Sequence, residues 1–153
     1  MNTDSSDTQA DSDLAIRATE ERARRARWQD YFTTAWTRLH AQGGPSCDAN
    51  GACLYRSDNH RVCGAGALFS DEKYVPAMEN ETINARIFRG MFPDEDYGAV
   101  YELQRAHDGV VSSLRCDRAH TAMNTPEFDA AWLPLWEDEM RRVASRNGYT
   151  VPT

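Results

Sequence analysis

The chain has 153 residues, the length of one domain, and its 41% apolar share allows a buried core without disulfide staples. Its formal charge of −7 disfavours general nucleic-acid binding, which needs clustered Lys and Arg. No window reaches the roughly 18 apolar residues of a membrane span, and the acidic residues 1–7 lack the apolar run of a secretion signal. We therefore expect a soluble, cytoplasmic protein that does not bind a membrane.

Residues 1–13 are mostly Asp, Ser, Thr and Gln, a composition that predicts a disordered acidic tail. Residues 14–153 are expected to form a single α+β domain. Its first element is a long helix, because residues 18–27 are rich in Ala, Glu and Arg. An apolar stripe at the helical period then continues to about residue 39, and the Gly-Gly-Pro of residues 43–45 ends the helix. The stripe consists of Trp28, Phe32, Ala35, Trp36 and Leu39.

Residues 53–68 are predicted to form a central β-hairpin. Residues 52–56 and 61–63 are short β-prone runs, and the Ser-Asp-Asn-His of residues 57–60 is typical of a turn. This register places Cys53 opposite Cys63. Gly64 and Gly66 leave one face of the second strand bare, so we expect a helix or a ligand to approach it closely.

A short helical turn is expected near residues 70–76 and a short helix over residues 83–91, and two longer helices follow. One opens at Pro93, buries residues 97, 100, 101, 103 and 107, and is closed by Gly109. A loop over residues 110–124 follows, with Cys116 and His120. The last helix starts at Thr125-Pro126, is kinked by Pro134 and ends at Asn147-Gly148. Its expected buried stripe consists of Phe128, Trp132, Leu135, Trp136, Met140 and Val143.

The predicted fold class is therefore α+β, a small helical domain with a central β-hairpin between a long N-terminal and a long C-terminal helix. The four cysteines, Cys47, Cys53, Cys63 and Cys116, show no C-x2-C pair of a structural zinc site. Free packing thiols are favoured in a reducing compartment. Redox chemistry, metal binding and a Cys53–Cys63 bond stay open as alternatives, and we predict no metal and no cofactor.

One group of polar side chains has the types that line small-ligand sites, namely aromatic rings, a guanidinium, imidazoles and carboxylates. The predicted ligand- or partner-binding residues are Tyr55, Arg56, His60, Tyr74, Glu79, His107 and Asp108. The adjacent pair His107-Asp108 also occurs in metal phosphohydrolases, which need further His or Asp ligands. Only His40, His60 and His120 are available for that role, and no catalytic residue is predicted.

Four arginines lie within residues 22–27 and offer a second hypothesis, that of a surface for nucleic acid or an acidic partner. They also have Glu20, Glu21 and Asp30 at helical spacing, which favours a solvated face with local ion pairs.

Several runs resemble a group of short, uncharacterised proteins from bacteriophage and bacterial genomes. They are Cys-Leu-Tyr-Arg at 53–56, Cys-x-x-Gly-x-Leu at 63–68, Asp-Glu-Lys-Tyr-Val-Pro-Ala-Met-Glu at 71–79 and Leu-Gln-Arg-Ala-His-Asp at 103–108. The turn at 57–60 lacks the glycine usual in that group, and the acidic tail is additional. The resemblance implies a phage or prophage setting, hence the host cytoplasm, and no particular activity.

The sequence thus predicts a non-enzymatic accessory protein that binds a host protein or a small ligand, for example against host defence. One alternative is a small hydrolase of a nucleotide or phosphate compound that uses His107 and Asp108. Another is a DNA-associated structural protein. The oligomeric state has no signature in the sequence.

Overall fold

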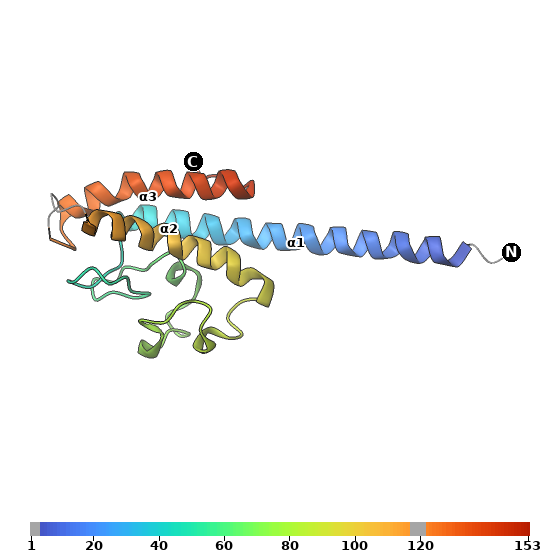
Figure 1. Ribbon diagram of the computed structural model, residues 1–153, viewed down its shortest axis with the longest axis horizontal. Helices are drawn as coiled ribbons and strands as arrows, with labels where there is room; N and C mark the ends of the chain where they lie inside the picture. The colour runs from blue at the N-terminus through green and yellow to red at the C-terminus, as the bar shows by residue number, and fades with distance from the viewer. Residues whose placement is uncertain (1–3, 117–121) are drawn as a thin grey trace.

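The structure of the protein is a computed structural model, in which residues 4–116 and 122–153 are described. Three α-helices build the fold, α1 (Asp4–Gln42), α2 (Tyr97–Cys116) and α3 (Pro126–Asn147). An irregular segment joins α1 to α2 and contains four 3-10 turns, η1 (Gly66–Leu68), η2 (Pro76–Met78), η3 (Arg86–Phe88) and η4 (Asp94–Asp96). In Figure 1, α3 lies above α1 and α2, and the irregular segment lies below them.

The predicted β-hairpin at residues 53–68 is wrong, and so is the α+β class, because the described part of the chain contains no β-strand. Two isolated antiparallel bridges occur there, one between Cys47 and Cys53 and one between Arg56 and Val62. Cys53 therefore faces Cys47 rather than Cys63. The chain curls after Cys63 instead of extending, since the Ala67 N–H donates to the Cys63 carbonyl at 2.9 Å and η1 follows.

The main hydrophobic core lies where α1, α2 and α3 meet. Phe32 and Leu39 of α1 are fully buried, as the helical stripe predicts. Trp132 and Trp136 of α3 are also fully buried and stack on each other with ring centroids 5.2 Å apart. Trp36 packs against Trp136 at 5.5 Å, so the aromatic rings of α1 and α3 form one continuous cluster.

A second core gives the irregular segment its shape in place of a sheet. Phe88 and Ile83 are fully buried there, together with Val100 of α2. The ring of Tyr55 lies 5.0 Å from that of Phe88 and 5.9 Å from that of Phe69. Apolar anchors spaced along the segment therefore fix it against the start of α2.

The end of α2 and the start of α3 can be compared with the helix boundaries that the sequence predicts. Gly109 does not close α2, which continues to Cys116, because the apolar stripe goes on through Val111 and Leu114. The predicted loop over residues 110–124 is therefore too long, and His120 lies outside the described residues. The start of α3 is confirmed, since the Thr125 side chain accepts a hydrogen bond from the Phe128 N–H at 3.2 Å.

Helix α1 begins at Asp4, within the stretch that the sequence predicts to be a disordered tail. Every residue from 8 to 20 is exposed, and this part of α1 extends beyond α2 and α3 in Figure 1. Within this stretch, the side-chain amide of Gln9 donates a hydrogen bond to Asp13 Oδ1, one turn further along the helix, at 3.0 Å. Disorder of residues 1–13 in solution stays a prediction.

A buried carboxylate joins α1 to the start of α2. Asp96 is fully buried and accepts hydrogen bonds from Arg27 Nε at 3.0 Å, Trp28 Nε1 at 2.7 Å and the Tyr31 hydroxyl at 2.8 Å. Burial alone would raise the pKa of Asp96, but the hydrogen bonds from Arg27, Trp28 and Tyr31 outweigh it and hold that pKa below its ordinary value. Burial and the bond to Asp96 raise the pKa of Tyr31 to about 12.

Gly64 lets the irregular segment touch the backbone of α2. A Cβ at position 64 would lie 2.2 Å from the Leu103 carbonyl oxygen, and one at Gly66 would lie 2.5 Å from that of Tyr55. Real Cβ atoms do not approach backbone so closely. The expectation that these glycines admit a close neighbour is therefore confirmed, and at Gly64 the neighbour is a helix.

Asp96→Asn is expected to lower the free energy of unfolding by about 2–3 kcal/mol, because hydrogen bonds to a charged group are lost. The native pKa lies below the unfolded value, so the contribution of Asp96 is complete above about pH 4 and is lost as the pH falls through the native pKa. Urea unfolding at pH 7 and pH 3 measures both effects. The exposed Asp94→Asn is the control, and equal losses in the two variants would contradict the role of Asp96.

Gly64→Ala is expected to destabilise the protein by roughly 1–3 kcal/mol, because the added methyl group overlaps the α2 backbone. Gly98→Ala is the matched control, since Gly98 is exposed on α2 with open space around its Cβ position. That change should stabilise the helix by about 0.5–1 kcal/mol. Thermal unfolding of both variants tests the pair, and a neutral Gly64→Ala would be inconsistent with this packing.

Candidate functional site

His107 occupies the buried face of α2, and its two ring nitrogens have different partners. The residue is fully buried, and its Nε2 accepts a hydrogen bond from the Ser46 backbone N–H at 3.0 Å. A backbone N–H can only donate, so Nε2 carries no proton, and Nδ1 then donates to Asp108 Oδ1 at 2.8 Å. The ring of Trp132 packs edge-on against the imidazole at 5.6 Å. The tautomer and the orientation of His107 are thus fixed by its surroundings.

Cys53 approaches the same carboxylate from the irregular segment. Burial is the largest cause that raises the pKa of the Cys53 thiol, and the negative charge and hydrogen bond of Asp108 raise it further. Burial likewise raises the pKa of Cys63 to about 12, with Asp108 as the second cause. These cysteines are therefore almost entirely protonated thiols at neutral pH, so any reaction that needs the thiolate is slow there.

The ligand atoms of Cys53, His107 and Asp108 lie within 4.8 Å of one another, so a metal site must be considered. A metal bound at Nδ1 would need that nitrogen deprotonated while Nε2 still faces the Ser46 N–H donor. Ligating histidines instead donate the proton of their second nitrogen to an acceptor. The three residues do not fit a metal centre, and the order of contacts, with Asp108 between the thiol and the imidazole, does not fit a catalytic triad either.

A second polar cluster contains four of the residues singled out in the sequence. Glu79 accepts hydrogen bonds from the backbone N–H groups of Tyr55 at 2.9 Å and Arg56 at 3.0 Å. The Tyr74 hydroxyl donates to the same carboxylate at 3.1 Å. Because both oxygens of Glu79 are occupied by these donors, the carboxylate stabilises the chain around residue 55.

The guanidinium of Arg56 is held by carbonyl groups. It donates to the carbonyls of Gly66 and Phe69, pairs with Asp71 at 2.9 Å and lies 4.8 Å from the centre of the Phe69 ring. Only 13% of the Arg56 side chain is exposed. Arg56 and Glu79 thus connect parts of the irregular segment and have little capacity left for a ligand.

The seven predicted site residues therefore do not form one site. Tyr55, Arg56, Tyr74 and Glu79 converge, and His107 and Asp108 form a separate pair with Cys53. His60 belongs to neither group, because it lies exposed at a turn with a φ of +64°.

A cavity of about 490 Å³ lies between the two groups, and its wall includes Tyr55, Cys53 and Asp108. The Tyr55 hydroxyl donates to the Glu81 carbonyl at 2.8 Å and meets Gln104 of α2 at this wall. Asn80, Thr82 and Ser112 add further polar groups. The cavity is the place where the predicted residues come closest to a shared concave surface.

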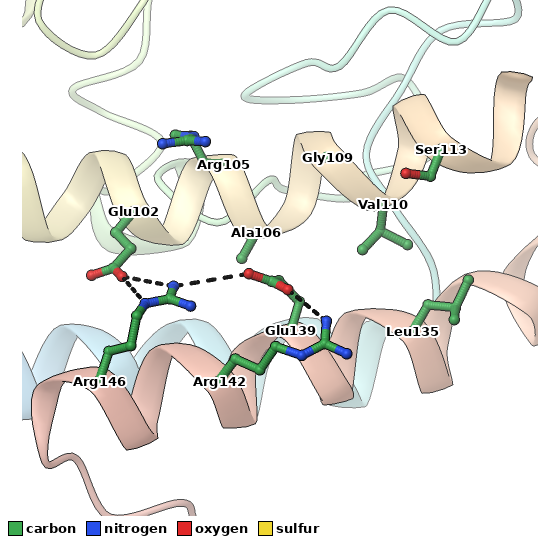
Figure 2. Close-up of a pocket in the computed structure, with 10 residues that line it drawn as sticks. All are labelled: Glu102, Arg105, Ala106, Gly109, Val110, Ser113, Leu135, Glu139, Arg142 and Arg146. Carbon is green, nitrogen blue, oxygen red and sulfur yellow. Dashed lines mark hydrogen bonds and ion pairs between the residues drawn. The ribbon is translucent and has the colours of Figure 1, made fainter.

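A larger groove of about 670 Å³ runs between α2 and α3, and none of its lining residues is among the seven site residues that the sequence predicts (Figure 2). Arg146 pairs with Glu102 at 2.9 Å, and Arg142 pairs with Glu139 at 3.0 Å, so the charges on its wall are largely matched. Leu135, predicted to be buried, is 46% exposed here. The groove is lined by Glu102, Arg105, Ala106, Gly109, Val110, Ser113, Leu135, Glu139, Arg142 and Arg146.

The arginine-rich stretch of α1 has local partners. Arg24 and Arg25 pair with Glu21, Arg22 donates to the Thr19 hydroxyl at 3.2 Å, and Arg27 is held by Asp96. With these partners the stretch matches the expected solvated face with local ion pairs better than a phosphate-binding surface.

No protein-family model matches the chain, and neither a curated protein nor a solved structure matches it. The resemblance to phage and bacterial proteins accordingly stays a prediction.

Among the helices of residues 4–116 and 122–153, none combines the length and the hydropathy required to cross a bilayer.

Glu79→Ala is expected to reduce the free energy of unfolding by roughly 2 kcal/mol, because two backbone N–H groups lose their shared acceptor. Glu72→Ala, which removes an exposed carboxylate of the same segment, should change it by less than about 0.5 kcal/mol. Chemical denaturation compares the two variants. If Glu79→Ala behaved like its control, the carboxylate would be free to serve a ligand instead.

Proposed function

We propose that this chain is a non-catalytic binding protein whose partner is a protein with a basic surface, and that residues 8–20 of α1 form the contact. The observation that carries the proposal is the exposure of this helical stretch beyond the body of the molecule (Figure 1). The resemblance to phage and bacterial proteins leads us to expect that the partner is a host protein.

The energetics of a helix explain why an exposed stretch of this kind suits binding. Residues 8–20 belong to a 39-residue helix, but their side chains are exposed, and most of the stability of a helix in a protein comes from packing. Leu14 and Ile16 are 64% and 56% exposed, so two large apolar side chains of this stretch have solvent around them. The two side chains point to different sides of the helix, and a partner that covered either of them would bury apolar surface.

Charge determines which kind of partner is favoured. Residues 8–20 contain three carboxylates, those of Asp11, Asp13 and Glu20, against the single guanidinium of Arg17. A basic protein surface complements this stretch, whereas nucleic acid would be repelled by it.

The hydrolase alternative has little support from the geometry. His107 is enclosed, its Nε2 is occupied by the Ser46 N–H, and Asp108 is shared with the Cys53 thiol.

A small ligand in the 490 Å³ cavity is the second candidate function, since ligand sites usually measure about 300–1,000 Å³.

Capture from host lysate by immobilised full-length chain tests the proposal. The double variant Leu14→Lys/Ile16→Lys and the double variant Asp11→Lys/Asp13→Lys are each expected to lose at least about tenfold in retention of a captured basic protein, which corresponds to about 1.4 kcal/mol. Retention by the unchanged chain should weaken as salt rises from 50 mM to about 500 mM, because surface charges are screened.

Val75→Lys is the matched control, since Val75 is also exposed, at 44%, but lies in the irregular segment. It should retain the same protein as the unchanged chain. Equal retention by all variants, or no basic protein captured at low salt, would rule out residues 8–20 as the contact.

A further inference from the structure

Cys47 and Cys53 face each other in an antiparallel bridge. The Asp48 N–H donates to the Ala52 carbonyl at 2.9 Å, and the Leu54 N–H donates to the Ser46 carbonyl at 3.1 Å. These bonds flank the two cysteines, so the pair is of the non-hydrogen-bonded kind, whose side chains project to the same side. Cα atoms in such pairs are about 4.5 Å apart, and disulfides span Cα distances of about 4.4–6.8 Å. The backbone thus already places the two residues within disulfide range.

The two thiols differ in their access to solvent. Cys53 lines the 490 Å³ cavity, whereas Cys47 is 2% exposed and its Sγ lies 3.6 Å from Asn124 Oδ1. Cys63 also borders this cavity, but it is not bridged to either residue and its Sγ accepts the Gly66 N–H at 3.3 Å. A small molecule in the cavity can therefore reach Cys53, and Cys47 lies behind it as the resolving thiol.

We propose that Cys47 and Cys53 form a reversible intrachain disulfide when the protein meets a small disulfide oxidant such as oxidised glutathione. The Cys53 thiolate attacks one sulfur of the oxidant and releases one glutathione thiolate, which leaves a mixed disulfide. The Cys47 thiolate then attacks the Cys53 sulfur and releases the second glutathione. The protein loses two protons and two electrons, and the oxidant gains them as two thiols.

The environment of the pair sets the rate of this exchange. Burial raises the pKa of Cys47 to about 11, with the charge of Asp48 as the next cause, and raises that of Cys53 as well. Only the thiolate reacts, so oxidation is slow at neutral pH and accelerates about tenfold per pH unit. Oxidation also withdraws the Cys53 sulfur from Asp108, which changes the wall of the cavity.

Thiol counting and peptide mapping of the full-length chain test the proposal. Cys116 is exposed and is replaced by Ser to prevent links between molecules, which leaves three thiols. Oxidised glutathione is expected to lower the count from three to one, and dithiothreitol should restore it. Trypsin cleavage after Arg38 and Arg56 yields one peptide with both Cys47 and Cys53, so the bond appears there as a loss of two hydrogens.

Two variants in the Cys116→Ser background identify the pair. Cys63→Ser should keep the loss of two hydrogens in residues 39–56, and Cys53→Ser should abolish it. An unchanged count, a link between residues 39–56 and the separate tryptic peptide 62–73, or a glutathione adduct that persists on Cys53 would each overturn the proposal. If a variant does not fold, mapping of the Cys116→Ser protein alone distinguishes these outcomes, because Cys63 lies on the other peptide.

Discussion

The carboxylate of Asp96 is the group on which the arrangement of the helices depends. Its partners lie on consecutive turns of α1, at Arg27, Trp28 and Tyr31, while Asp96 itself immediately precedes α2. A buried charge is tolerated only where several donors satisfy it, so the four side chains select one register of α1 against α2. The aromatic core of α1 and α3 supplies most of the buried apolar surface, but apolar packing alone is less specific about register.

The polar groups around the irregular segment follow the same rule. Glu79 satisfies two backbone N–H groups, Arg56 satisfies backbone carbonyls, and the imidazole of His107 accepts the Ser46 N–H. A segment without strands lacks the regular inter-strand hydrogen bonds that pair backbone groups in a sheet. Side chains therefore make hydrogen bonds to these backbone groups instead. Residues of the types found in ligand sites therefore have structural roles here.

The helices could be predicted from the sequence, because apolar residues recur at the helical period in each of them. Phe32 belongs to such a stripe in α1, Trp132 and Trp136 belong to the stripe of α3, and Thr125 caps α3. The hairpin could not, because short runs of β-prone residues are also compatible with an irregular chain fixed by anchors such as Phe88. Leu135 fits the stripe of α3 by spacing alone, and only the position of α2 reveals its exposure. Asp96 gives no signal of its own beside Asp94 and Glu95, since its partners are almost seventy residues away in the sequence.

The unbroken course of α1 sets the distance between the exposed stretch and the junction with α2. Leu14 and Arg27 are thirteen residues apart on one helix, which corresponds to a distance of about 20 Å along the helix axis. A partner bound at Leu14 would therefore act about 20 Å from the hydrogen bond between Arg27 and Asp96. One continuous helix thereby connects a contact at residues 8–20 with the junction of α1 and α2.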